Sequence, residues 1–258
     1  MDERAAGSQP RHRRYDAIGR GYATKRRPDR RIQSAINEAL GDAETVLNVG
    51  AGTGSYEPID RAVVAIDPSV EMLAQRPRNE KRAARAVAEH LPFRRHAFDA
   101  AMAVLTVHHW GDRRAGYAEL RRVARRRVVL TYEPAIHNDL WIVRDYVPEI
   151  GELDRDRPGF SVAEVAEGIG ASEVVSVPIP WDCTDGFITA YWRRPEAFLD
   201  PRVRQSTSGF SLVDPDAVTR GLHRLQADLA SGAWEERYGY LAQTDELDTG
   251  IRLVVAQG

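Results

Sequence analysis

The sequence predicts an α/β protein with a doubly wound, mostly parallel seven-stranded sheet and a helical lid inserted before the last strand. Three observations lead to this prediction. Short apolar runs alternate with helical patterns, a glycine-rich turn follows the first apolar run, and polar residues gather where several runs end. Alternating strands and helices are typical of parallel sheets, whose ligands bind beyond the carboxyl ends of the strands.

The composition is that of a globular, enzyme-sized protein. The chain has 258 residues, 43% of them hydrophobic, which is enough for one large core or a core with a smaller lobe. Cys183 is the single cysteine, which excludes an internal disulfide and an all-cysteine metal site, and we expect a cytoplasmic protein. No segment resembles a signal peptide, and no apolar run approaches the ~18 residues that span a bilayer, so no membrane partner is expected.

The beginning of the chain is basic, although the net charge of the whole chain is only -2. Residues 1–14 lack apolar periodicity, which predicts a disordered basic arm. Its arginines can contact phosphates, but there is little aromatic interleaving and no known nucleic-acid motif nearby, so nucleic acid is not the expected partner. Tyr15, Ile18 and Tyr22 then follow at helical spacing and would share one face of a helix.

The first half of the chain predicts its elements through apolar periodicity. Residues 30–40 form a helix with Ile32 and Ile36 on its inner face, and Gly41 ends it. The further elements expected here are strands at 46–49, 62–66, 87–93, 98–107 and 127–131, with helices at 69–75 and 112–124.

The second half has a looser pattern. A helical insertion is expected over 135–158, followed by a helix over 161–169 with Ser161 as its cap and Glu164 at the capping-box position. Strands at 174–178 and 251–255 complete the sheet. The interval between them is too long for a hairpin loop and must carry its own structure, including a helix opened by Asp214. We therefore divide the chain into the arm 1–14, the α/β domain 15–178, the lid 179–250 and the last strand 251–258.

The stretch TVLNVGAGTG, residues 45–54, is the centre of the predicted site. Glycine has no Cβ and accepts positive φ, so Gly50, Gly52 and Gly54 suit a backbone that closely approaches a ligand. Asp67 ends the next strand, where a carboxylate can hydrogen-bond a ribose diol; the alternative is a structural Asp that caps the following helix. The G-x-G-x-G order lacks the third glycine position of dinucleotide sites, which argues against NAD.

Several motifs now resemble those of one family. VLNVGAGTG is similar to motif I, VVAIDPSVEML to motif II, and AEHLPFRRHAFDAAMAVLTVHHW to the third and fourth motifs of class I S-adenosylmethionine-dependent methyltransferases. RRVVLTYEP is similar to the fifth strand. The resemblance covers roughly residues 15–135. Within the family it points to the small-molecule group that includes ubiquinone and menaquinone C-methyltransferases.

The resemblance implies S-adenosyl-L-methionine as cofactor and assigns its contacts residue by residue. The glycine turn would surround the methionine part, Asp67 would hold the ribose hydroxyls, and Leu105 would lie near the sulfonium. Asn48 stands where the family usually has an acid. Tyr15, Tyr22 and Arg27 would hold the carboxylate. The implied cofactor residues are therefore Tyr15, Tyr22, Arg27, Asn48, Gly50, Ala51, Gly52, Gly54, Asp67, Pro68, Ser69, Met72, Ala88, Glu89 and Leu105.

Methyl transfer is an in-line displacement, so positioning of the acceptor can supply most of the catalysis. Where a base is used, His109 or His108 at the exit of the fourth strand is the candidate; the alternative is that both only shape the turn. His137 is a weaker candidate. Aromatic residues of the lid suit a planar or hydrophobic acceptor, although they would equally form the core of the lid. The candidate substrate residues are His137, Trp181, Asp185, Tyr191 and Trp192.

The sequence thus predicts a methyltransferase that acts on a small organic acceptor by O-, N- or C-methylation, as a monomer or homodimer and without a metal. Two alternatives stay open. One is an RNA or protein methyltransferase that uses the basic arm. The other is an S-adenosylmethionine-binding protein without transferase activity.

Overall fold

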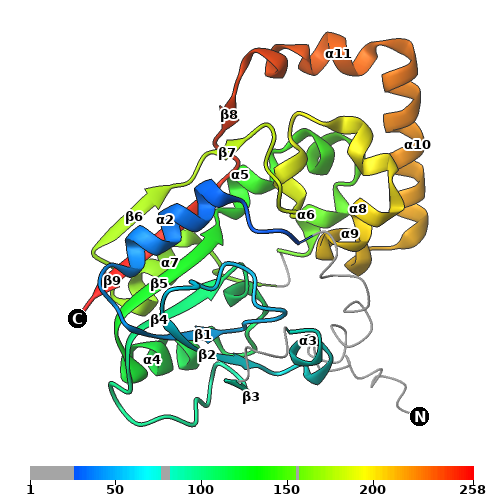
Figure 1. Ribbon diagram of the computed structural model, residues 1–258. Helices are drawn as coiled ribbons and strands as arrows, with labels where there is room; N and C mark the ends of the chain where they lie inside the picture. The colour runs from blue at the N-terminus through cyan, green and yellow to red at the C-terminus, as the bar shows by residue number, and fades with distance from the viewer. Residues whose placement is uncertain (1–25, 77–81, 155–156) are drawn as a thin grey trace, which may run out of the picture.

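The computed structural model describes residues 26–76, 82–154 and 157–258, which form a seven-stranded sheet, helices beside it and a group of short helices beyond one end of the strands (Figure 1). The strands are β1 (Thr45–Val49), β2 (Ala62–Asp67), β3 (Ala83–Arg85), β4 (Phe98–Val104), β5 (Ala124–Tyr132), β6 (Glu173–Ser176), β7 (Ile179–Pro180), β8 (Glu246–Leu247) and β9 (Ile251–Gln257). The α-helices are α2 (Arg30–Leu40), α3 (Val70–Ala74), α4 (Arg113–Val123), α5 (Pro134–Asn138), α6 (Glu149–Glu152), α7 (Val162–Ile169), α8 (Pro201–Gln205), α9 (Ser208–Leu212), α10 (Pro215–Ser231) and α11 (Ala233–Tyr238). Shorter helical turns are η2 (Val107–His109), η3 (Ile142–Tyr146), η4 (Ile188–Tyr191), η5 (Pro195–Leu199) and η6 (Gly239–Gln243).

The sheet has the strand order β3-β2-β1-β4-β5-β9-β6. β9 runs antiparallel to both of its neighbours, and the other pairs are parallel. This confirms the predicted doubly wound, mostly parallel sheet. The chain leaves β1 toward β2 and β3 on one side and returns to β4 and β5 on the other. Sheets of this kind bind ligands at such a switch point, beyond the carboxyl ends of the strands.

Helices cover both faces of the sheet. Arg126 on β5 donates from Nη1 to the carbonyl of Ala39 in α2 at 2.7 Å, and the next residue, Arg127, donates from Nη2 to the carbonyl of Ile169 in α7 at 3.1 Å. Because successive side chains of a strand point to opposite faces, α2 and α7 lie on opposite faces. α4 packs against α7. The central strands are therefore shielded from water, in agreement with their apolar sequences.

Local sequence signals set the ends of two helices. The Asp29 side chain accepts a hydrogen bond from the backbone N–H of Arg31 and begins α2, and Gly41 ends that helix with φ 59°. The Ser161 hydroxyl accepts from the backbone N–H of Glu164 and begins α7, as predicted. Gly170 ends α7 in the left-handed conformation that glycine tolerates.

The predicted third strand is wrong. β3 covers Ala83–Arg85 and pairs with the edge of β2, whereas 87–93 forms turns in which Ala88 and Leu91 are buried. Apolar residues in a turn that packs on the core imitate a strand pattern. The fourth strand also ends earlier than predicted, at Val104, because Leu105 has φ 50° and cannot continue it.

The segment between β6 and β9 carries the structure that its length requires. β7 and β8 pair with each other at its two ends, and short helices lie between them. Asp214 caps α10, as predicted. A Cβ at Gly221 of α10 would lie 2.2 Å from the carbonyl oxygen of Tyr146, so this glycine lets α10 approach η3 closely. The division of the chain into a domain and a lid remains a prediction.

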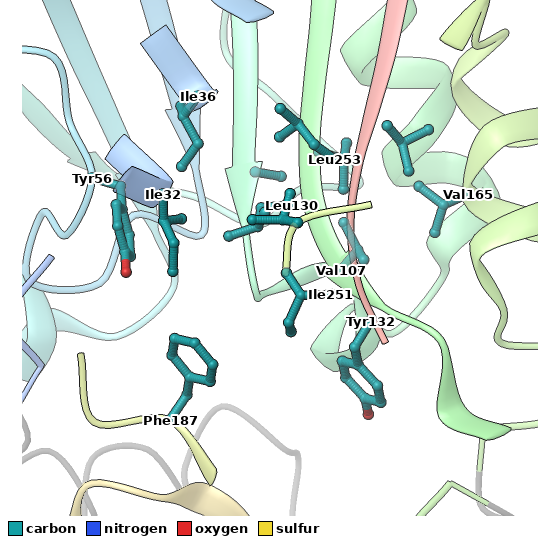
Figure 2. Packing of buried hydrophobic residues seen from close by; sticks show 14 of the residues in the cluster. Ile32, Ile36, Tyr56, Val107, Leu130, Tyr132, Val165, Phe187, Ile251 and Leu253 are labelled. Atoms are coloured by element: carbon teal, nitrogen blue, oxygen red, sulfur yellow. The ribbon is translucent and has the colours of Figure 1, made fainter. Parts of the chain in front are cut away.

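One hydrophobic cluster joins the sheet, the helices and this segment. Figure 2 shows Ile32 and Ile36 of α2, Leu130 of β5, Leu253 of β9 and Phe187 of the segment before η4 among its members. In the described part of the chain, no helix has both the length and the apolar character needed to cross a membrane.

Candidate functional site

A cavity of about 430 Å³, here called the first cavity, lies at the carboxyl ends of β1, β2 and β4. Cofactor sites typically have volumes of ~300–1,000 Å³ and lie at the switch points of such sheets. The cavity brings together most of the residues that the sequence predicts for the cofactor. These are Asn48, Gly50, Ala51, Gly52, Asp67, Pro68, Ser69, Met72, Ala88, Glu89 and Leu105.

The glycine turn after β1 forms one wall of the first cavity. Gly50, Gly52 and Gly54 have φ values of 72°, 52° and 96°, in the region where residues with a Cβ are strained. A Cβ at Gly50 would lie 2.1 Å from Oγ1 of Thr106. The exits of β1 and β4 can approach each other this closely because glycine occupies this position.

Asp67 links the end of β2 to the glycine turn. One carboxylate oxygen accepts the backbone N–H of Gly52 at 2.8 Å, and the other accepts that of Ser69 at 2.8 Å. The Ser69 hydroxyl accepts from the backbone N–H of Met72 and caps α3. The helix cap is therefore Ser69. Asp67 is only 8% exposed and lines the cavity, so its carboxylate is held in place before any ligand binds.

Asn48 belongs to a cluster of polar side chains that also contains Glu57 and Arg76. Its Nδ2 donates to Glu57 Oε1 at 2.8 Å, and Glu57 Oε2 pairs with Arg76 Nη2 at 2.5 Å. Asn48 Oδ1 is buried and has no hydrogen-bond partner among the residues that the structure describes. Gly54 lies outside the cavity lining, and a Cβ there would approach Arg76 Nη1 to 2.9 Å. Gly54 therefore leaves room for Arg76.

The turns after β3 and β4 also line the first cavity. Glu89 Oε1 accepts the backbone N–H groups of Gly111 at 2.7 Å and Asp112 at 3.0 Å, and thereby joins the two turns. Leu105 has a positive φ without being glycine, a conformation that costs about 1–3 kcal/mol and is concentrated at functional sites. Its side chain helps to line the cavity.

The predicted carboxylate-holding residues have different positions. Tyr15 and Tyr22 lie outside the described residues. Arg27 is exposed and lines neither of the two cavities described here, whereas its neighbour Arg26 lines the first cavity and a second one. Three consecutive basic residues, Lys25 to Arg27, give the sequence no signal that would distinguish Arg26.

A buried ion pair fixes Arg26. Its Nε and Nη2 donate to the two carboxylate oxygens of Asp185 at 2.7 and 3.1 Å, and the two side chains are 10% and 0% exposed. The Tyr56 hydroxyl donates to the same carboxylate at 2.9 Å. A bidentate pair of this kind is both strong and directional. It joins the segment before α2 to the segment between β6 and β9.

The second cavity, of about 100 Å³, adjoins the first. Arg26, Leu105 and His109 line both. The short helices beyond the sheet supply much of the remaining wall. Its lining also includes His108, Tyr132, His137, Asp154, Arg157, Ser206, Thr207 and Leu212.

The predicted catalytic residues His108 and His109 lie in η2, at the exit of β4. Their ring centroids are 3.8 Å apart, and His108 also contacts Tyr132 edge-on at 5.1 Å. Burial, reinforced by the neighbouring His109, Arg157 and His137, lowers the pKa of His108 well below its ordinary value. His108 is therefore a neutral ring near neutral pH.

Four of the predicted substrate residues do not line either described cavity. Trp192 is fully buried and donates from Nε1 to the carbonyl of Ile179, and Tyr191 is buried in the hydrophobic cluster. Asp185 is committed to Arg26, and Trp181 is 44% exposed. Their roles toward a substrate remain predictions that this geometry does not support. His137, by contrast, lines the second cavity.

Comparison with known proteins agrees with this geometry. Residues 47–131 match the family model described as a methyltransferase domain. A solved structure of a proposed methyltransferase from an antibiotic biosynthesis pathway of Anabaena variabilis ATCC 29413 is 29% identical to the chain, with a TM-score of 0.80. The similarity covers 91% of this chain and 99% of that one. No curated protein sequence matches the chain.

The [4+2]-cyclase SpnF is 15% identical, with a TM-score of 0.53 over 97% of each chain, and shares the fold alone. The sheet order, the cavity at its switch point and the matched domain define a class I methyltransferase fold. Residues 47–131 are a methyltransferase domain, and the fold is that of the class I S-adenosylmethionine-dependent methyltransferases, which together support an enzyme of this class. The ubiquinone and menaquinone subgroup is not confirmed.

Proposed function

We propose that the protein transfers a methyl group from S-adenosylmethionine to a small organic acceptor bound in the second cavity. The observation that carries this proposal is the wall shared by the two cavities: Arg26, Leu105 and His109 line both. A transferase needs a donor site and an acceptor site that meet, so that the reacting atoms come into line. The first cavity has a volume suited to the cofactor, and the second is suited to the reactive end of a compact acceptor.

The residues of the first cavity fit the cofactor. The glycine turn offers a cradle that a Cβ at Gly50 would fill. Asn48 Oδ1 is a buried acceptor without a partner in the described chain, and such atoms are usually satisfied by a ligand or water. The ammonium group of the methionine part would supply a donor there. Asp67 would accept from the ribose hydroxyls, since an ionised carboxylate has about four acceptor positions.

Arg26 replaces Arg27 as the candidate partner of the cofactor carboxylate, because it reaches the cavity and Arg27 does not. When bound, S-adenosylmethionine supplies a methyl group on a positively charged sulfur. The side chains of this protein then have two tasks. Those at the shared wall orient the acceptor, and the short helices over the second cavity exclude water.

Filling the second cavity tests this proposal. Leu212 lines the second cavity and not the first, so Leu212→Trp should abolish methyl transfer while the affinity for S-adenosylhomocysteine changes less than about twofold. Leu229→Trp on α10, outside both linings, is the matched control. Transfer is followed as tritium passing from labelled S-adenosylmethionine into a panel of small phenols, alcohols and amines. Label that appears only in RNA or protein of a cell extract would contradict the proposal.

A further inference from the structure

His137 in α5 is held by its neighbour in the sequence. Its Nδ1 lies 3.0 Å from Oδ1 of Asn138. An amide oxygen accepts hydrogen bonds and cannot donate them, so the proton of this contact belongs to His137 Nδ1. The tautomer therefore depends on which end of the Asn138 amide faces the ring.

The other end of the Asn138 amide settles that question. Its Nδ2 donates to Oδ2 of Asp154 at 3.0 Å. Asp154 also receives the Tyr132 hydroxyl at 2.9 Å and Arg157 Nη1 at 2.6 Å, both at Oδ1. A carboxylate paired with a guanidinium accepts and does not donate, so it selects the NH2 end of the amide. The amide oxygen is thereby directed to His137.

The consequence is a neutral imidazole with its lone pair on Nε2. His137 lines the second cavity, and its Nε2 makes no hydrogen bond with the described residues. Burial lowers the pKa of His137, with Arg157 acting in the same direction, although the bond to Asn138 and the charge of Asp154 oppose the change. A neutral ring with one fixed proton has an unprotonated nitrogen available to accept a proton.

His108 lacks this arrangement. Its Nδ1 is buried without a hydrogen-bond partner in the described part of the chain, and burial lowers its pKa. No described contact selects its tautomer. Side chains that take a proton during catalysis are commonly held in orientation by a third group.

The charges around the second cavity indicate the kind of acceptor. Arg157 is paired with Asp154, and Arg26 with Asp185. The hydroxyls of Ser206 and Thr207 donate to the carbonyl of Val203 at 2.7 and 3.1 Å. Arg26 is the candidate partner of the cofactor carboxylate, which leaves Arg157 as the arginine of this cavity for an acceptor. Because Arg157 already faces the Asp154 carboxylate, the cavity favours an uncharged acceptor over an anion. A phenolic or enolic hydroxyl, with a pKa near that of tyrosine at ~10, suits a weakly basic histidine better than an aliphatic alcohol does.

We propose that His137 Nε2 takes the proton of a neutral phenolic or enolic acceptor, with Asn138 and Asp154 as its positioning residues, an inference that rests on the proposed function. The O–H bond breaks and the proton moves to Nε2. The oxygen electron pair forms the bond to the methyl carbon, and the pair of the broken carbon–sulfur bond stays on sulfur. The products are the methyl ether, S-adenosylhomocysteine and the protonated His137, which returns its proton to water.

Histidine side-chain NMR on the ¹⁵N-labelled full chain tests this inference without any acceptor. The wild-type protein at neutral pH should show His137 with a protonated Nδ1 and a bare Nε2, assigned through ring-to-Cβ connectivity. Asn138→Leu should shift this population toward the Nε2-protonated form. Asn37→Leu, an amide in α2, is the matched control and should leave it unchanged. A wild-type His137 that is protonated on Nε2, or charged at neutral pH, would overturn the proposal.

Kinetics with phenol and the more acidic 4-nitrophenol provide the second readout. His137→Gln should lower kcat with phenol by about 10²- to 10⁴-fold at a nearly unchanged KM, and should lower it less with 4-nitrophenol. Equal rates for variant and wild type would overturn the role of His137. Binding of S-adenosylhomocysteine, measured separately, keeps the two proposals apart. If the wild-type protein does not bind S-adenosylhomocysteine, the proposed function is wrong. The tautomer of His137, by contrast, tests only the role of His137.

Discussion

Arg26 and Asp185 form a bidentate ion pair across 159 positions of sequence, with Nε and Oδ1 2.7 Å apart. Both side chains are withdrawn from water, and the Tyr56 hydroxyl adds a third contact. The pair fixes a cation on the wall that the two cavities share. It therefore couples the position of the segment between β6 and β9 to the geometry of the site.

Removal of one partner of this pair should destabilise the fold. Asp185→Ala leaves Arg26 as a buried charge without its counterion, which should lower the free energy of unfolding by about 3–5 kcal/mol in urea titrations. Asp182→Ala is the matched control, because Asp182 pairs with Arg31 at the surface, where both side chains are about half exposed. That change should stay below about 1 kcal/mol. Similar decreases in the free energy of unfolding for the two variants would show that the burial of the Arg26–Asp185 pair does not determine its contribution to stability.

The carboxylate of Asp67 should contribute directly to cofactor affinity. Asp67→Ala removes an acceptor from the first cavity and should weaken the binding of S-adenosylhomocysteine by about 1–3 kcal/mol in isothermal titration calorimetry. Asp99 offers a close control, since it also accepts two backbone N–H groups, those of Glu44 and Thr45, but lies at the start of β4. Asp99→Ala should leave the affinity unchanged. An unaltered affinity for Asp67→Ala would refute the assignment to the ribose.

Gly50 should tolerate no side chain. Gly50→Ala combines a left-handed φ with a Cβ placed 2.1 Å from Thr106 Oγ1, so we expect a loss of about 2–5 kcal/mol in unfolding free energy. Gly159→Ala has a similar φ of 74° but open space around its Cβ, and should cost about 1–2 kcal/mol. The double variant Gly50→Ala with Thr106→Gly should recover part of the difference. No recovery would show that the clash is not the cause.

The sequence predicted the sheet because its central strands are buried on both faces and read as continuous apolar runs. It failed at β3, whose residues Ala83–Arg85 are exposed at the edge and carry no apolar pattern. The neighbouring turn misled the prediction because Ala88 and Leu91 are buried there without being in a strand. An apolar residue in the sequence indicates that its position is buried, and burial depends on tertiary packing as much as on secondary structure.

The residues of the candidate site also divide into those that the sequence predicts and those that only the folded structure reveals. Gly50 and Asp67 were found because a tight turn and a strand-end carboxylate leave local signals. Arg26 was missed, since its position depends on a partner 159 residues away and its neighbour Arg27 has the same chemistry. The contact of Asn138 with Asp154 likewise arises from folding, because no helical or strand spacing brings residues 16 apart together. Such sites need the tertiary structure.

The buried neutral histidine of η2 should make the fold sensitive to mild acid. Burial lowers the pKa of His108 well below its value in the unfolded chain, which is ~6.5. The unfolded state therefore binds a proton that the folded state does not, and stability is present above ~6.5 and falls as the pH drops toward the folded pKa. The expected slope is up to about 1.4 kcal/mol per pH unit.

His108→Gln removes this proton uptake, so its unfolding free energy should fall less than that of the wild type between about pH 7 and about pH 5. His223→Gln, on the exposed face of α10, is the control and should follow the wild-type curve. Urea titrations at a series of pH values measure the difference. Parallel curves for His108→Gln and wild type would mean that His108 accepts its proton in the folded state, because only then does unfolding take up no proton at this residue.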